Sequence, residues 1–242
     1  MDLDFSGKTV LVVGGSSGIG NGVAHGFRER GARVHVWGTR ASAADYDGMD
    51  GSDLKGLGYA KVDVGVREEI AAAETIAPLD VLVLCQGTVQ YRRAEFEPEG
   101  WDRVMAVNLD SLMDCARKFR STLAERKGVI IIVSSVSGYT SNRGNPAYAA
   151  SKAGAVSLTK TLGEAWAPEG IRVVGLAPGL VDTKLTKVTT ENPQRLEASL
   201  RAIPLGRMGT PADMAGAALL LASPLAGYVV GQTLIVDGGL SL

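Results

Sequence analysis

The alternation of short apolar runs with helical patterns constrains the fold of this chain more than any other feature. Seven runs rich in Val, Ile and Leu have the length and continuity of strands that are buried on both faces. They span residues 9–15, 33–38, 57–64, 79–87, 128–135, 171–179 and 232–239. Continuous apolar strands that alternate with helices are typical of a parallel sheet covered by helices on both faces.

The segments between the strands predict helices of ordinary length. Helical patterns occupy residues 18–31, 66–76, 101–126, 147–167 and 211–223. Residues 41–57 are polar and glycine-rich, so we expect a loop or a short helix there rather than a full crossover helix. Because no linker, repeat or low-complexity tract interrupts the pattern, residues 1–242 are predicted to form a single α/β domain.

Charge and composition argue against several classes of protein. The chain has 25 basic and 26 acidic residues, which gives no electrostatic reason to bind nucleic acid or an anionic membrane. The longest apolar runs are too short to span a bilayer, and the N-terminal "MDLDFSGK" does not resemble a secretory signal. Cys85 and Cys115 suggest neither a disulfide framework nor a metal site. We expect a soluble, cytoplasmic protein without a metal.

A glycine-rich loop, "VGGSSGIG", separates the first predicted strand from the first predicted helix. Its spaced glycines are Gly14, Gly18 and Gly20. Such a loop lets backbone N–H groups and a helix N-terminus approach a pyrophosphate. A tight turn that binds nothing is the alternative interpretation.

A second motif lies in the stretch "NPAYAASKAGAVSLTK", where Tyr148 and Lys152 are four residues apart on a predicted helix. Residues at this spacing lie on the same helix face. Taken alone, the two could be an ordinary surface pair. The alternative is a phenol whose pKa is lowered by a neighbouring cation, which would make it an acid–base catalyst.

With the glycine loop upstream and Tyr-x-x-x-Lys downstream, the chain resembles the short-chain dehydrogenase/reductase family, in particular its 3-oxoacyl-acyl-carrier-protein reductase-like branch. The resemblance extends from "GKTVLVVGGSSGIG" to "VVGQTLIVDGG". It implies a doubly wound, Rossmann-type seven-stranded parallel sheet that binds NAD or NADP. It also implies an oxidoreductase that interconverts a secondary alcohol and a ketone.

The same resemblance implies a catalytic group of Asn108, Ser135, Tyr148 and Lys152. Tyr148 would exchange the proton with the substrate oxygen, and Lys152 would lower its pKa and hold the nicotinamide ribose. Ser135, rather than the adjacent Ser134, would orient the substrate oxygen, although a serine at a strand end is often only a turn residue. Asn108 would hold a water beside the lysine. The alternative for Asn108 is a buried side chain that bonds backbone.

The resemblance further implies a set of cofactor contacts distributed over most strand ends. These are Gly14, Ser16, Ser17, Gly18, Ile19, Gly20, Gly38, Thr39, Arg40, Asp63, Val64, Gln86, Gly87, Tyr148, Lys152, Pro178, Gly179, Val181 and Thr183.

The end of the second strand favours NADP over NAD. NAD-dependent members usually carry an acid there that bonds the adenine-ribose hydroxyls. Here Gly38 stands at the matching position, and Thr39 and Arg40 follow. A guanidinium is a good partner for a 2′-phosphate. Arg40 could also be an ordinary solvated charge, and Ser17 stands where NADP-using members often have a basic residue, so NAD is the alternative cofactor.

Two departures from the family pattern concern the loops around the cofactor. Val13 replaces a usual threonine before the glycine loop. The usual Asn-Asn-Ala-Gly after the fourth strand is "LCQG" here, residues 84–87, which implies altered bracing of the sheet. Gln86 is expected to point toward the cofactor.

Residues 184–209 are predicted to form a mobile lid over the substrate, with Ser137, Asn145 and Leu180 lining the cavity. The helix 147–167 and the C-terminal "LIVDGGLSL" correspond to surfaces that relatives use to form tetramers, so we expect a homotetramer, with simple core packing as the alternative. Two other functions are considered. One is a cofactor-binding regulatory or scaffold protein without turnover. The other is a nucleotide-sugar epimerase or dehydratase, which the short C-terminal part disfavours.

Overall fold

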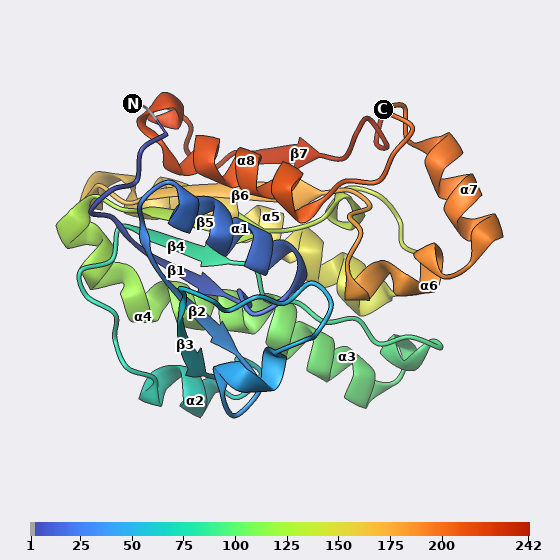
Figure 1. Cartoon of the computed structure of the whole chain (residues 1–242), viewed down its shortest axis with the longest axis horizontal. Coiled ribbons are helices and arrows are strands. Elements are labelled where there is room, and N and C mark those ends of the chain that lie inside the picture. Colours follow the sequence, from blue (N-terminus) through green and yellow to red (C-terminus); the bar gives the residue numbers. More distant parts are fainter. Residues whose placement is uncertain (1–2) are drawn as a thin grey trace.

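A computed structural model describes residues 3–242, and it contains the predicted seven-stranded parallel sheet (Figure 1). The strand order is β3-β2-β1-β4-β5-β6-β7. The strands are β1 (Thr9–Val13), β2 (Arg33–Gly38), β3 (Gly58–Lys61), β4 (Val81–Leu84), β5 (Val129–Val133), β6 (Arg172–Pro178) and β7 (Thr233–Val236). All six neighbouring pairs are parallel, so the doubly wound α/β prediction is confirmed.

Helices cover both faces of the sheet and divide the core into two parts. On one face, α1 (Gly18–Glu29) packs against α8 (Pro211–Ala222), and both contribute to an apolar core that includes Val10 and Val12 of β1. On the other face, α2 (Arg67–Ala72), α4 (Ser111–Arg126) and α5 (Pro146–Trp166) pack over Leu11 and Val13. Successive residues of a strand point to opposite faces, so one continuous apolar strand serves both cores.

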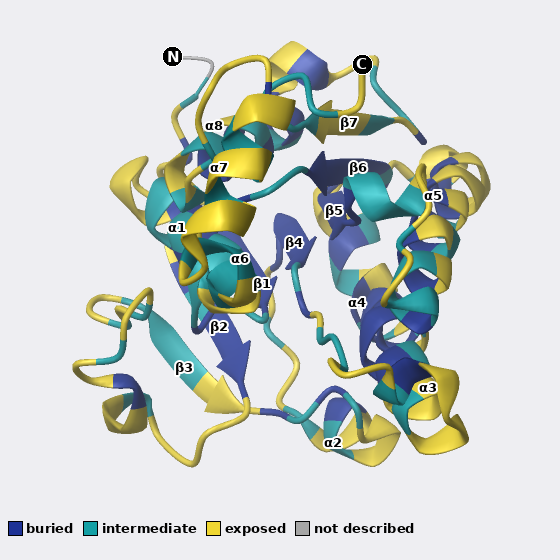
Figure 2. Ribbon diagram, turned by 90° about the vertical axis from the view of Figure 1, so that its right-hand side faces the viewer, coloured by how far each residue is buried: buried dark blue, intermediate teal, exposed yellow. Residues whose placement is uncertain are grey.

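The two edges of the sheet are less buried than its centre. In Figure 2 the central strands are dark blue, whereas β3 and β7 are teal and yellow. On β7, Leu234 is 40% exposed and Ile235 is 38% exposed. An exposed apolar edge strand is a surface on which another chain can pack.

The strand order reverses next to β1, and this reversal creates the crevice that positions the site. From β1 the chain proceeds to β2 and β3 on one side, and then returns to β4 on the other side. The connections that leave the carboxyl ends of β1 and β4 therefore diverge. Ligands of open α/β sheets bind in the crevice that forms at such a point.

The predicted helix over residues 101–126 is wrong in detail, because the structure divides it. Helix α3 (Pro98–Met105) is followed by a π-helical segment, Ala106–Asp110, and then by α4. Asn108 lies in the π-helical segment. Its side chain forms hydrogen bonds with both the backbone N–H and the carbonyl oxygen of Thr88. π-helical turns of this kind often occur at functional sites.

The two segments that the pattern left least regular have partial structure. Within residues 41–57 only Ala43–Tyr46 form a 3-10 helix, as expected for a loop with a short helix. Residues 184–209 contain a 3-10 helix, Lys184–Thr186, and the helices α6 (Lys187–Thr190) and α7 (Pro193–Ala202). The other 3-10 helices are Ala94–Phe96, Val136–Gly138, Ala167–Glu169 and Pro224–Ala226.

Two features are absent from the described residues. No helix within residues 3–242 is long and apolar enough to cross a membrane. The same residues contain no group of three or more His, Cys, Asp or Glu side chains that could hold a metal ion. The start of the N-terminal segment, residues 1 and 2, lies outside the described residues.

Candidate active site

A cavity of about 400 Å³ lies at the carboxyl ends of β1, β4, β5 and β6. It brings together most of the residues that the sequence singled out. Those that line it are Gly14, Ser16, Ser17, Gly18, Ile19, Gly20, Gly38, Thr39, Asp63, Val64, Gln86, Gly87, Ser135, Tyr148, Lys152, Pro178, Gly179, Val181 and Thr183. Asn108 and Arg40 are not among the lining residues, and neither are Ser137, Asn145 and Leu180, which were expected to line the substrate cavity.

The glycine loop at the start of α1 has the close backbone packing that its sequence predicts. Gly14 and Gly18 have φ values of 75° and 55°, which disfavour any residue with a Cβ. A Cβ on Gly20 would overlap the carbonyl oxygen of Gly14, and one on Gly14 would lie 2.9 Å from the backbone of Gln86. Ser17, the N-cap of α1, makes no capping hydrogen bond with its side chain. The helix N-terminus that borders the cavity therefore suits an anionic group such as a pyrophosphate.

The phenol of Tyr46, from the 3-10 helix Ala43–Tyr46, packs against the end of β2, which the sequence did not indicate. The hydroxyl of Tyr46 accepts hydrogen bonds from the backbone N–H of Thr39, at 3.2 Å, and of Arg40, at 3.3 Å. A Cβ built on Gly38 would lie 2.6 Å from this hydroxyl and 2.7 Å from Oγ of Ser16. The guanidinium of Arg40 lies over the Tyr46 ring, 5.4 Å from its centroid. Tyr46 thus occupies the space above Gly38 and fixes the turn that follows it.

Tyr148 and Lys152 lie on the first turns of α5, and Nζ of Lys152 is 5.7 Å from the centroid of the Tyr148 ring. The ammonium donates a hydrogen bond to the carbonyl oxygen of Val133, at 2.9 Å. Lys152 is only 4% exposed, and burial lowers its pKa to about 8. Burial therefore destabilises the charged form of this lysine, which lies beside the end of β5.

The largest effect on the Tyr148 phenol in the structure is its burial. Burial raises the pKa of the Tyr148 phenol, and side-chain hydrogen bonding with Ser135 only partly opposes the increase. Because desolvation disfavours the phenolate, the phenol retains its proton near neutral pH. A retained proton suits donation to a carbonyl oxygen rather than abstraction from an alcohol.

The two serines after β5 take different roles, as alternation along a strand predicts. Oγ of Ser134 donates to the carbonyl oxygen of Lys152, at 2.7 Å, and so fastens α5 to the sheet. Oγ of Ser135 accepts from the backbone N–H of Ser137, at 3.1 Å, and lies at the Tyr148 phenol. Of the pair, Ser135 is the one that the geometry places beside Tyr148.

Asn108 lies behind the cavity wall rather than in it. Its side chain is fully buried, accepts from the N–H of Thr88 at 2.7 Å, and donates to the carbonyl oxygen of Thr88 at 2.9 Å. A Cβ on Gly87 would lie 3.6 Å from Nζ of Lys152 and 3.8 Å from Oδ1 of Asn108. Asn108 and Lys152 therefore both lie close to Gly87.

The departure after β4 is explained by contacts on the α4 side. Gln86 is 4% exposed, and its Nε2 donates to Oγ of Ser111 at 2.9 Å. Its side-chain amide is directed at α4, so the expectation that it points toward the cofactor is wrong. Its Oε1 is buried and has no hydrogen-bond partner within residues 3–242. Cys85 lines the cavity, and burial raises the pKa of its thiol to about 11.

Several lining residues were missed in the sequence. Thr88 directly follows the glycine after β4, and its position next to a strand end was an available signal. Arg103 reaches the cavity from α3 and bonds the Asp63 carboxylate at 3.4 Å, a contact that no local pattern indicates. Leu185 and Thr186 belong to the segment expected to cover the substrate.

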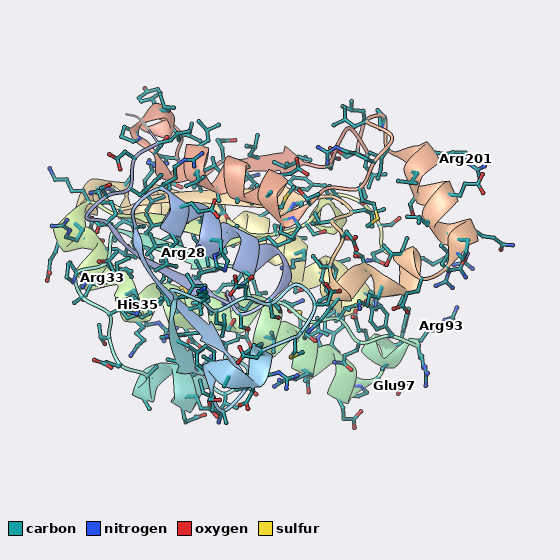
Figure 3. The ribbon with its side chains drawn as sticks, in the orientation of Figure 1. Arg28, Arg33, His35, Arg93, Glu97 and Arg201 are labelled. Carbon is teal, nitrogen blue, oxygen red and sulfur yellow. The ribbon has the colours of Figure 1, made fainter. Side chains whose placement is uncertain are left out.

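The two histidines take no part in the site. His25 lies on α1 and His35 on β2. In Figure 3, His35 and Arg33 lie on the opposite side of the molecule from Arg201 of α7. Neither histidine is among the residues that line the cavity, so a hydrolase that relies on histidine as a base is excluded for this cavity.

A doubly wound sheet, a glycine loop at a helix N-terminus and a Ser–Tyr–Lys group in one cavity define a dinucleotide-dependent oxidoreductase as the class of protein. Two features of the cavity suit a dinucleotide. The N-terminus of α1 borders the cavity, and glycines stand where a side chain would fill the crevice.

Comparisons with known proteins agree with this class. The model of the family described as "Enoyl-(Acyl carrier protein) reductase" matches residues 13–241. The 3-oxoacyl-[acyl-carrier-protein] reductase FabG of Chlamydia pneumoniae is 39% identical over 254 residues, which cover 100% of both chains. Galactitol 2-dehydrogenase (L-tagatose-forming) of Cereibacter sphaeroides is 38% identical, over 96% of this chain and 94% of its own.

A solved structure shares the fold as well. The crystal structure of a putative 2-deoxy-D-gluconate 3-dehydrogenase from Agrobacterium tumefaciens, with bound NADP, has a TM-score of 0.88 and 33% identity, over 99% of this chain and 98% of its own. The chain belongs to the short-chain dehydrogenase/reductase family, and it is an oxidoreductase of that family.

Proposed function

We propose that this protein uses NADP(H) to interconvert a ketone and a secondary alcohol, with Ser135, Tyr148, Lys152 and Asn108 as its catalytic group. The observation that carries the proposal is the convergence of Ser135, Tyr148 and Lys152 on one cavity with the glycine loop. When bound, the nicotinamide supplies or accepts the hydride. Every other element of the reaction falls to side chains of this chain.

In the reductive direction, Tyr148 donates the proton to the carbonyl oxygen. Its raised pKa keeps that proton in place near neutral pH. Ser135 lies at the phenol and orients the substrate oxygen by hydrogen bonding. The Lys152 ammonium stabilises the phenolate that forms, and the donors that Val133 leaves free would hold the nicotinamide ribose. Asn108 holds the loop after β4 against this lysine.

The cofactor residues that line the cavity are assigned from the glycine loop, from the ends of β2 to β4, and from the segment after β6. We assign NADP as the cofactor because the end of β2 offers no carboxylate. A side-chain carboxylate at position 38 would collide with the Tyr46 hydroxyl. Thr39, the next residue, lines the cavity, and Arg40 follows it. The NADP bound in the Agrobacterium tumefaciens structure supports the same choice.

Residues 184–209 act as a lid over the substrate. Lys184, Leu185 and Thr186 line the cavity, and Leu185 and Val188 are 43% and 44% exposed. Apolar side chains that are half exposed beside a cavity gain burial when a substrate binds under them.

We assign the assembly as a homotetramer and the compartment as the cytoplasm. The apolar residues exposed around β7 and α8, among them Leu220, Tyr228, Leu234 and Ile235, support assembly through that edge. The free thiols Cys85 and Cys115 suit a reducing compartment.

The test is a Tyr148→Phe variant assayed with a panel of ketones and secondary alcohols. We expect the variant to bind NADPH as tightly as the wild-type protein, measured by nicotinamide fluorescence, and to lose at least about a hundredfold in kcat. Turnover that survives the substitution would contradict the assigned acid. A protein that binds the cofactor but turns over no carbonyl compound would instead match the scaffold alternative.

A further inference from the structure

Glu95 is a buried acid that the catalytic group above does not include. It lies in the 3-10 helix Ala94–Phe96 between β4 and α3, and it is only 1% exposed. Its neighbours Phe96 and Glu97 are exposed, and Figure 3 shows Glu97 at the outer surface beside α3. Burial is therefore specific to Glu95 and not a property of the segment.

Both carboxylate oxygens of Glu95 accept hydrogen bonds at the start of α5 and in the loop after β4. Oε1 accepts from the N–H of Gln90 at 3.0 Å and from Nδ2 of Asn145 at 3.1 Å. Oε2 accepts from the backbone N–H of Tyr148 at 2.9 Å. All three partners are uncharged, so this acid is not held by an ion pair with any of them.

Glu95 replaces the usual N-cap of α5. Tyr148 is the third residue of that helix, so its N–H has no partner within the helix. Asn145 is the N-cap residue, yet it makes no capping bond, because its side-chain amide donates to the carbonyl oxygen of Gln90 and to Glu95. The cap comes instead from a carboxylate 53 residues away in sequence. A negative charge at a helix N-terminus is also favoured by the helix dipole.

The backbone before Glu95 adopts an unfavourable conformation to deliver it. Arg92 and Arg93 have φ values of 57° and 62°, in the left-handed region that residues other than glycine rarely adopt. Conformations of this kind persist where surrounding contacts hold them, and they are frequent at functional sites. Here the two residues form the turn that directs Glu95 inward.

The same loop contacts the proposed lid. The hydroxyl of Tyr91 donates to the carbonyl oxygen of Leu185, a residue that lines the cavity. The loop that carries Tyr91 and Glu95 therefore connects residues 184–209 with the start of α5.

We propose that Glu95 is a positioning residue: it fixes the backbone of Tyr148, and through it the phenol, relative to Lys152, Ser135 and the substrate. This inference rests on the proposed function, because it assumes that Tyr148 transfers the proton. Glu95 itself touches neither cofactor nor substrate in this assignment, and it acts through Tyr148.

The charge of Glu95 gives the proposal a second, separable consequence. The titratable groups around the phenol are Cys85 after β4, Tyr91 and Glu95 in the loop, and Lys152 on α5. The negative charge of Glu95 raises the pKa of Tyr148, in the same direction as burial. Removing the charge while keeping the side-chain shape should therefore lower the pKa of the phenol.

The experiment compares Glu95→Gln, Glu95→Asp and the exposed control Glu97→Gln. In Glu95→Gln the one remaining oxygen should face the two donors, the N–H of Gln90 and Nδ2 of Asn145, so the NH₂ group faces the N–H of Tyr148. The Tyr148 backbone then loses its hydrogen bond and its fixed position. We expect kcat to fall about 10- to 100-fold, as displacements near 1 Å produce, while the Kd for NADPH changes less than about threefold. Glu95→Asp retains the charge but withdraws it by one methylene, so kcat falls and the phenol titrates as in the wild type.

The ionisation of Tyr148 is measured without substrate, as the difference in near-ultraviolet absorbance between each protein and its Tyr148→Phe counterpart. We expect this ionisation to move to lower pH in Glu95→Gln only. Unchanged kcat and unchanged ionisation in Glu95→Gln would reject the positioning role. If Glu95→Gln does not fold, a folded Glu95→Asp with wild-type kcat rejects it equally. If the wild-type protein reduces no carbonyl compound but the titration still shifts, the proposed function fails and the contact with Tyr148 stands.

Discussion

The hydroxyl of Tyr46 closes the space above Gly38, since a Cβ on Gly38 would lie 2.6 Å from it. The phenol cannot easily move aside, because Tyr46 is 5% exposed and accepts two backbone hydrogen bonds. We therefore expect Gly38→Asp, the obvious change toward NAD, to cost about 1–3 kcal/mol of unfolding free energy through overpacking. It should weaken NADPH binding without strengthening NADH binding.

Removing the Tyr46 side chain should allow an aspartate at position 38 to favour NADH. In Gly38→Asp/Tyr46→Ala the carboxylate has room, so we expect thermal stability to recover partly and the Kd ratio to move at least tenfold toward NADH. Thermal unfolding and fluorescence titration with both cofactors measure the two effects, with Tyr46→Ala alone as the control. A single Gly38→Asp variant that is stable and prefers NADH would contradict the role of Tyr46.

The pH dependence of reduction should follow Lys152. Its pKa is lowered to about 8, so the ammonium that supports the Tyr148 phenolate is present below that pH and is lost above it. We expect kcat/KM for NADPH, which reports groups of the free enzyme, to fall as the pH rises through about 8. In Lys152→Arg the charge persists at all accessible pH values, so the fall should disappear even if the rate is lower. A wild-type kcat/KM that does not change as the pH passes through about 8 would contradict the prediction.

The sequence predicted the strands and the order of the motifs because these features depend on local patterns. A short continuous run such as Val129–Val133, rich in β-branched residues, favours a buried strand, and the Tyr148–Lys152 spacing follows from helical periodicity. What it could not predict depends on contacts between distant segments. Tyr46 reaches Gly38 from a polar loop, and Glu95 reaches Tyr148 across 53 residues. Neither pair leaves a periodic signal.

The pKa of Tyr148 shows a second limit of sequence reasoning. The sequence showed a neighbouring cation, which lowers the pKa of a phenol, but it did not show how much surrounding protein displaces water from it. In the structure the desolvation is the larger effect, and it reverses the direction of the shift. The split of residues 101–126 has a similar origin, because the bonds between Asn108 and Thr88 belong to tertiary structure.

Lys152 should be retained at a cost to stability. Its pKa in the folded protein, about 8, lies below the reference value of 10.5, so the unfolded chain binds more protons between these two pH values. The unfolding free energy should therefore increase as the pH rises from about 8 to 10.5, and the full penalty applies at neutral pH. We expect Lys152→Met to abolish turnover yet stabilise the fold at pH 7 by about 1–2 kcal/mol, after allowance for the lost bond to Val133.

Denaturant unfolding at neutral and alkaline pH measures this effect, with the exposed Lys160→Met on the same helix as the control. The gain should shrink at alkaline pH, where the wild-type lysine is neutral in both states. A Lys152→Met protein that is less stable than the wild type at neutral pH would show that burying the Lys152 ammonium does not cost unfolding free energy.

Assembly through the β7 edge can be tested with one charged side chain. Leu234 is 40% exposed on an edge strand, and a carboxylate buried there in a tetramer would be desolvated without a partner. We expect Leu234→Glu to lower the mass measured by light scattering from four copies to two or one, with little change in the thermal stability of each subunit. Val66→Glu is the matched control, because Val66 is 38% exposed beside α2, near the opposite edge of the sheet. If both variants remain tetramers, the contact surface lies elsewhere; if both dissociate, the effect is one of net charge rather than of the β7 edge.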